Sequence, residues 1–163
     1  MGSRRWTRLD LLTAMDEIWD NYLKRLSAMP IKQQTAYAKR NGYSQPKELI
    51  AHLAAWIAET VRVMPYLCRD KHLPRDDTND DVFNARVIER CRRLSRAEVE
   101  AEFRRQRLAL KKLIAALPDD ALQVTRVYRW LSETIISHYQ DHQLPEWSLV
   151  QLRHGKQSNR GSV

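Results

Sequence analysis

The stretch "LIAHLAAWIAETVRVMPYL", residues 49–67, repeats its large side chains at the period of an α-helix. Steps of four, three, four, three and four residues separate the members of this row, which are Leu49, Leu53, Trp56, Thr60, Val63 and Leu67. A row of this kind covers one side of a helix and predicts packing against other helices. We expect the helix to run from about Pro46 to Arg69. Ser44 or Gln45 would cap its first turn.

Breaks in the pattern divide the rest of the chain. Pro65 predicts a kink or an early end, because proline inside a helix costs about 3 kcal/mol. A helix from Trp6 to about Met29 precedes the quoted stretch. Residues 31–45 follow it as a connection with room for one short helical turn, ended by the breaker pair Asn41-Gly42. The charged residues 69–81 predict a loop, and "VFNARVIERCRR" after them predicts a short extra helix.

The start of the next helix has the sharpest local signal. Ser95 and Glu98 have the spacing of a capping box, and Leu94 and Val99 that of a hydrophobic staple. This helix should begin at Ser95 and end before Pro118. A last helix is expected from about residue 125 or 126 to 143, with an inward row of Tyr128, Leu131, Ile135, His138 and His142.

Composition supports an all-α chain. Of 163 residues, 43% are hydrophobic and only four are glycine, which favours helices over a turn-rich β fold. The length suits one domain with a real core. We therefore predict a single four-helix bundle over residues 1–152, with a polar, disordered tail over residues 153–163.

The charge and the cysteines restrict partners and location. The formal charge of +8 could favour nucleic acid, anionic membranes or a negatively charged small molecule, but the basic residues are interspersed with acidic and apolar ones, which disfavours nucleic acid. Cys68 and Cys91 form no C-x-x-C motif, and no signal peptide is recognisable. No stretch approaches the roughly 20 uninterrupted apolar residues of a membrane span. We expect a cytoplasmic protein outside the membrane.

Three histidines fall on inward sides of the predicted helices. His138 and His142 are four residues apart in "ISHYQDHQLPEW", and His52 lies beside the row of the quoted helix. Two imidazoles one turn apart can bind one metal ion, although most such pairs are surface residues or hydrogen-bonded core residues. In a simple up-down-up-down bundle the two helices would be parallel and His52 would lie far from the pair. The long connection from about Leu67 to Glu102 allows an antiparallel arrangement instead.

Four segments together resemble the DinB-like (DinB/YfiT) superfamily of metalloenzymes over roughly residues 8–150. They are "ELIAHLAAW", "VFNARVIERCRRLSRAEVEAEF", "LPDDAL" and "HYQDHQLPEW". The resemblance implies a four-helix bundle whose crossover brings His52, His138 and His142 together as metal ligands. A partial similarity to the ClbS/DfsB four-helix-bundle family concerns the "LIAHLAAW" and "SHY" parts. His142 favours the metal-binding branch.

The resemblance also implies a chemistry. Three neutral imidazoles suit divalent Zn, Ni, Co or Fe, and three protein ligands leave a position for water, whose pKa the ion lowers toward ~7, or for the thiolate of a small thiol. A hydrolase or a thiol-dependent S-transferase acting on a small molecule follows. The alternatives are a ClbS/DfsB-like, metal-independent hydrolase or sequestering protein for a small toxin, and a non-enzymatic dimeric binding protein. Homodimers are common in this fold family.

Four more residues are candidates for the site. Glu59, two turns after His52, could accept an imidazole N–H bond or act as a general base, but its plainer role is that of a solvated helix residue. Trp56, Asn84 and Tyr139 could line a substrate pocket. Their plainer roles are core packing for the two aromatic residues and helix capping for Asn84. His72 and His154 are expected in solvent.

Overall fold

The computed structural model describes residues 5–73 and 79–145, and every element within them is helical. The α-helices are α1 (Arg8–Ala14), α2 (Asp20–Ala28), α3 (Ile31–Arg40), α4 (Pro46–Cys68), α5 (Asp80–Arg92), α6 (Arg96–Ala116), α7 (Thr125–Ser132) and α8 (His138–Asp141). The π-helical turns η1 (Met15–Trp19) and η3 (Glu133–Ser137) join α1 to α2 and α7 to α8, and the 3₁₀ turn η2 (Ala121–Gln123) precedes α7. The predicted all-α bundle is confirmed.

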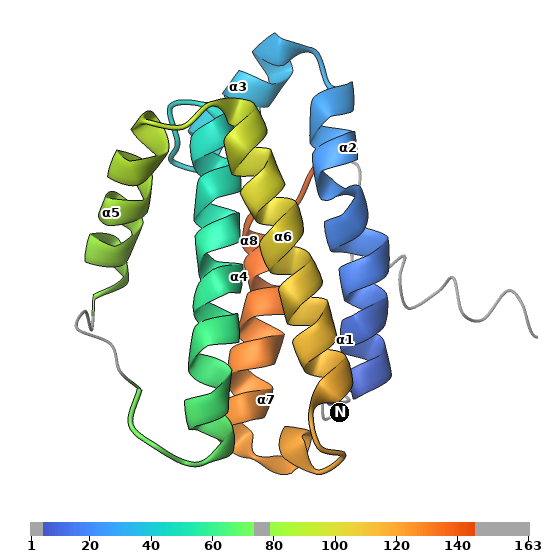
Figure 1. The fold of residues 1–163 in the computed structure, drawn as a ribbon. Coiled ribbons are helices and arrows are strands. Elements are labelled where there is room, and N and C mark those ends of the chain that lie inside the picture. Colours follow the sequence, from blue (N-terminus) through green and yellow to red (C-terminus); the bar gives the residue numbers. More distant parts are fainter. Residues whose placement is uncertain (1–4, 74–78, 146–163) are drawn as a thin grey trace, which may run out of the picture.

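The connection between α4 and α6 decides how the helices are oriented (Figure 1). Both α4 and α6 run away from the end of the bundle that α3 covers, and α5 returns the chain along the outside between them. The last column, α7 to α8, runs back toward α3 and is therefore antiparallel to α4. The predicted crossover and its short extra helix are confirmed. The first half of α4 and the end of α8 consequently meet at the same end of the bundle.

Local signals explain most helix boundaries. Ser95 caps α6 as predicted, with its hydroxyl oxygen 3.2 Å from the backbone nitrogen of Glu98. Gln45 is the N-cap of α4, and the Glu48 carboxylate accepts hydrogen bonds from the backbone N–H groups of Ser44 and Gln45. This helix continues through Pro65 to Cys68, so it does not end early at the proline.

The prediction for residues 31–45 was wrong, because α3 is a helix of ten residues. Its inner side buries Gln34, Tyr37 and Ala38. It ends in a Schellman turn: Gly42 has φ of 86°, and the N–H groups of Gly42 and Tyr43 donate to the carbonyls of Lys39 and Ala38 at 3.0 Å. The periodicity of this short, polar segment was too weak to separate a helix from a loop.

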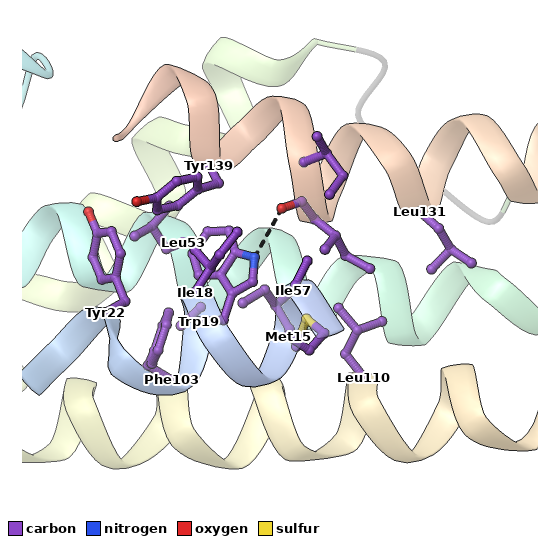
Figure 2. Close-up of a cluster of buried hydrophobic side chains, with 14 of the residues drawn as sticks. Met15, Ile18, Trp19, Tyr22, Leu53, Ile57, Phe103, Leu110, Leu131 and Tyr139 are labelled. Carbon is purple, nitrogen blue, oxygen red and sulfur yellow. Dashed lines mark hydrogen bonds between the residues drawn. The ribbon is translucent and has the colours of Figure 1, made fainter. Parts of the chain in front are cut away.

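The core is centred on aromatic rings (Figure 2). Trp19, Tyr22, Phe103 and Tyr139 are each about 1% exposed, and neighbouring rings lie 5.7 to 6.4 Å apart. The indole N–H of Trp19 donates to the carbonyl of Ile135 at 3.0 Å, the dashed line in Figure 2. Because Trp19 lies in η1 and Ile135 in η3, this bond joins the two π-helical turns, where the regular i to i+4 bonding is interrupted.

Two expectations concern the chain as a whole. None of the helices within the described ranges is long and apolar enough to cross a bilayer. The proposed boundary at residue 152 and the tail over residues 153–163 lie outside the described residues, and the single domain stays a prediction.

Candidate metal centre

Three histidine side chains from two helical columns meet beside the bundle core. His52 is on α4 and 6% exposed, His138 begins α8, and His142 directly follows it. Each offers one ring nitrogen, and these three atoms lie within 4.8 Å of one another. The ring centroids are 4.9 to 5.1 Å apart. The antiparallel arrangement of α4 and α8 thus brings together the histidines that the sequence places far apart.

Burial keeps these rings uncharged at neutral pH. Desolvation and the nearby His142 lower the pKa of His52 to about 4. Desolvation lowers the pKa of His138 to about 3, with further contributions from His52 and His142. The pKa of His142 is also lowered by desolvation, against an opposing effect of Asp141. Neutral imidazole is the form that binds metal, so no proton has to be removed from a cation before binding.

Asparagine side chains contact the outer nitrogen of two of the rings. Nδ1 of His52 lies 3.0 Å from Oδ1 of Asn84, on the crossover helix α5. Nδ1 of His142 lies 2.8 Å from Oδ1 of Asn41, the residue that ends α3. Each contact leaves Nε2 of the ring directed away from the asparagine. Nε2 of His52 lies 2.8 Å from Nε2 of His138.

Tyrosines hold the backbone of His142. The hydroxyls of Tyr22 and Tyr37 both reach its carbonyl oxygen, Tyr22 at 3.3 Å, and they lie 3.1 Å from each other. The ring of Tyr43 lies 5.2 Å from that of His52 and 6.3 Å from that of His142. Burial raises the pKa of the Tyr43 hydroxyl to about 12. The segment that includes α3 and its terminal turn therefore covers one side of the histidines.

The other predicted residues are distributed differently. Trp56 lies beside the centre, with its ring 6.5 Å from His52 and 6.4 Å from His138. Asn84 also lies there and contacts His52. Tyr139 belongs to the aromatic core, where its ring packs edge-on against Trp19 at 5.8 Å. His72 is exposed as expected, and His154 lies outside the described residues.

The carboxylate of Glu59 pairs with a neighbouring arginine. Its carboxylate oxygens accept hydrogen bonds from the guanidinium of Arg62 at 2.8 and 2.7 Å. It lines a cavity of about 510 Å³ between α4, α5 and α6 whose lining includes none of the three histidines. The acceptor for His52 is Asn84 instead, because α5 packs over the side of α4 that carries His52.

Four residues around the histidines could not be recognised as site residues from the sequence: Asn41, Tyr22, Tyr37 and Tyr43. Asn41 was interpreted only as half of a breaker pair with Gly42. A polar side chain next to a glycine that ends a helix has the right position to reach a neighbouring element, but nothing in the spacing indicates which one. Tyr22 lies in the predicted first helix, but its bond to His142 depends on the packing of three segments.

The donor set fits a metal ion, and the fold and site together define a class. Three neutral ring nitrogens that share one space, two of them oriented by amide oxygens, are a typical arrangement for divalent metals that prefer imidazole. The molecule is thus a helical bundle with a crossover and a candidate three-histidine metal centre. Residues 14–150 match the sequence profile of the DinB superfamily, and the chain belongs to that superfamily. No curated protein and no solved structure matches the chain.

Proposed function

We propose that this protein is a divalent-metal-dependent enzyme acting on a small molecule, with His52, His138 and His142 as the metal ligands. One observation carries the proposal: ring nitrogens from two separate helical columns come within 4.8 Å of one another, in a cluster of one buried and two half-buried histidines. Neutral imidazole nitrogens gathered this closely are the kind of donor set that divalent transition metals prefer. A metal ion would satisfy all three at once.

When bound, Zn, Ni, Co or Fe would supply Lewis-acid activation of a water molecule or of a small thiol, which supports a hydrolase or a thiol-dependent S-transferase. The chain's own residues hold the histidine ligands in place and orient their rings. Asn84 and Asn41 support the outer nitrogens of His52 and His142, and Tyr22 and Tyr37 hold the backbone of His142.

Aromatic rings surround the centre and supply its apolar wall. The rings of Tyr43 and Trp56 both lie next to that of His52, at 5.2 and 6.5 Å, and both lower the local polarity around the imidazoles. We assign Trp56 and Asn84 to the boundary of the substrate site. Glu59 receives no role as a general base, because Arg62 binds its carboxylate, and Tyr139 receives none in substrate binding, because it is buried among core rings.

Metal content tests the proposal. Tag-free protein, stripped with a chelator and reconstituted separately with Zn, Ni, Co and Fe, should retain about one equivalent of at least one of these metals by inductively coupled plasma mass spectrometry. His52→Ala and His138→Ala should lose it, and His72→Ala, an exposed histidine, should not. Wild type without metal after every reconstitution, or equal retention in all variants, would contradict the proposal.

The predicted location and assembly extend the proposal. The free thiols of Cys68 and Cys91 are suited to a reducing cytoplasm. A homodimer would show an apparent mass near twice 19.3 kDa in solution. If activity persisted in a chelator yet was lost on changing Trp56, the metal-independent, ClbS/DfsB-like alternative would replace the metalloenzyme.

A further inference from the structure

We infer that Asn84 and Asn41 fix the proton positions on His52 and His142, so that both rings present an unprotonated Nε2 before any metal arrives, whereas His138 must move its ring proton to bind. The inference deepens the proposed function and rests on it for the identity of the bound ion. The proton positions themselves are properties of the metal-free protein.

Trp56 determines the orientation of Asn84. An indole N–H can only donate, and Nε1 of Trp56 lies 3.0 Å from one end of the Asn84 amide. That end must therefore be the oxygen. The same oxygen lies 3.0 Å from Nδ1 of His52, so Nδ1 must carry the proton. A neutral imidazole has one N–H, and Nε2 of His52 is left with its lone pair.

The orientation of the Asn41 amide is determined in the same way, but by a neighbouring acceptor instead of a donor. Its Nδ2 donates to the backbone carbonyl of Tyr37 at 2.9 Å, and a carbonyl can only accept. The amide oxygen of Asn41 therefore faces Nδ1 of His142, 2.8 Å away, and that nitrogen must donate. Two asparagines from different elements, one at the end of α3 and one on α5, thus select the same tautomer.

The ring of His138 must carry its proton on the other nitrogen, Nε2. Nε2 of His138 lies 2.8 Å from Nε2 of His52, and two lone pairs would repel at that distance. Because His52 has no proton there, His138 must donate from Nε2. Binding a cation through this atom removes that proton, and protonation of Nδ1 from solvent keeps the ring neutral.

Nuclear magnetic resonance of the metal-free protein tests the proton positions. In ¹⁵N-labelled wild type near pH 7.5, long-range ¹H–¹⁵N spectra should show Nδ1–H rings for His52 and His142 and an Nε2–H ring for His138. Exposed His72 provides the reference for an unconstrained ring. Adding zinc should convert His138 to the Nδ1–H form. An Nε2–H pattern for His52, or a His138 that keeps its Nε2 proton with zinc bound, would overturn the inference.

Variants of Asn84 test whether its oxygen is the cause. Asn84→Leu should mix the tautomers of His52 and weaken metal binding ~10–100-fold, and Asn84→Asp, which keeps an oxygen acceptor, should restore the Nδ1–H form. Asn79→Ala is the matched control, because Asn79 caps the first turn of the same helix without touching a histidine. Equal effects of Asn79→Ala and Asn84→Leu would show that docking of α5, not the amide oxygen, is responsible, and would overturn the role.

The two proposals can fail separately. If wild type binds none of the four metals, the proposed function fails, and the metal-free spectra still decide the tautomers. If metal binds but Asn84→Leu changes neither affinity nor the His52 spectrum, the inference fails while the metal centre stands.

Discussion

Two neighbouring residues of one helix, His138 and Tyr139, separate two regions that are built on different principles. The ring of Tyr139 packs against Trp19 and Tyr22 in the aromatic core, 5.8 and 6.4 Å away. The ring of His138 meets His52 at 4.9 Å in the histidine centre. Burial holds the core together, whereas side-chain hydrogen bonds from other elements set the direction of each ring in the centre.

This difference predicts different responses to substitution. Packing energy grows with the apolar area removed from water, so changes in the core should reduce stability. Orientation depends on single donors and acceptors, so changes around the histidines should reduce metal binding while leaving most of the stability intact. The predictions that follow go from the largest expected effect on stability to the smallest.

Trp19→Ala should give the largest loss. Removing this 1% exposed ring leaves a cavity and costs about 3–5 kcal/mol, measured as the free energy of unfolding in urea. Trp19→Phe keeps a ring but removes the N–H that bonds Ile135, and should cost about 1–3 kcal/mol through the unpaired carbonyl. A Trp19→Ala loss below about 1 kcal/mol would mean that burial does not dominate this region.

Acidification should weaken the metal-free protein through the histidine centre. The pKa is about 4 for His52 and about 3 for His138 in the folded state, against about 6.5 in an unfolded chain. Between these values the unfolded state binds more protons, so this contribution to stability is present above about pH 6.5 and is lost as the pH falls. Urea unfolding at pH 7.5, 6 and 5 should show the decline before most carboxylates titrate.

Two variants separate the centre from the rest of the chain in that experiment. His138→Leu removes one of the depressed groups and should make stability less dependent on pH. His72→Ala should leave the dependence unchanged, because His72 is exposed. A wild-type stability that stays constant from pH 7.5 to 5 would show that the cluster is not held neutral by burial.

The same contrast explains how much could be predicted from the sequence. The row from Leu49 to Leu67 and the capping box at Ser95 follow from helical geometry, and signals of this kind were enough for the long helices. They did not indicate α3, and the crossover that brings the histidines together was implied by the family resemblance. The row for the last helix was partly wrong in phase. A π turn inserts one residue, which rotates later positions by roughly 100°. The buried row is Val127, Leu131, Ile135 and Tyr139, and the π turn accounts for Tyr139 in place of His138. Both histidines of this last column lie beside the row, half-buried.

The partners of the histidines were less accessible to such reasoning. Spacing along one helix allowed Glu59 as an acceptor for His52, since both lie on similar sides of α4, although a solvated glutamate was the plainer interpretation. The acceptor is Asn84, which comes from another helix. Which side of α4 the crossover helix covers depends on packing between the two helices, such as that of Phe83 on α5 against Trp56 on α4, whose rings lie 4.7 Å apart. Periodicity within one helix contains no information on that packing.

Two substitutions with small effects on stability compare the surroundings of the histidine centre with the opposite end of the bundle. Gly42→Ala forces a side chain into the left-handed conformation at φ of 86°, at a cost of about 1 kcal/mol, and the added Cβ would meet no atom within 4 Å. Thr7→Ala removes the cap of α1 at the opposite end of the bundle, also for about 1 kcal/mol (Figure 1). Urea unfolding should give nearly equal losses.

Metal affinity should nevertheless distinguish the two variants. Gly42 follows Asn41 in the turn that ends α3, so a shift of this turn moves the amide oxygen away from Nδ1 of His142. Gly42→Ala should therefore weaken zinc binding, by less than the ~10–100-fold of a fully lost partner, and Thr7→Ala should leave it unchanged. Competition with a chromophoric chelator measures both. Equal affinities would mean that the three ligands alone determine binding and that the α3 turn contributes only to folding.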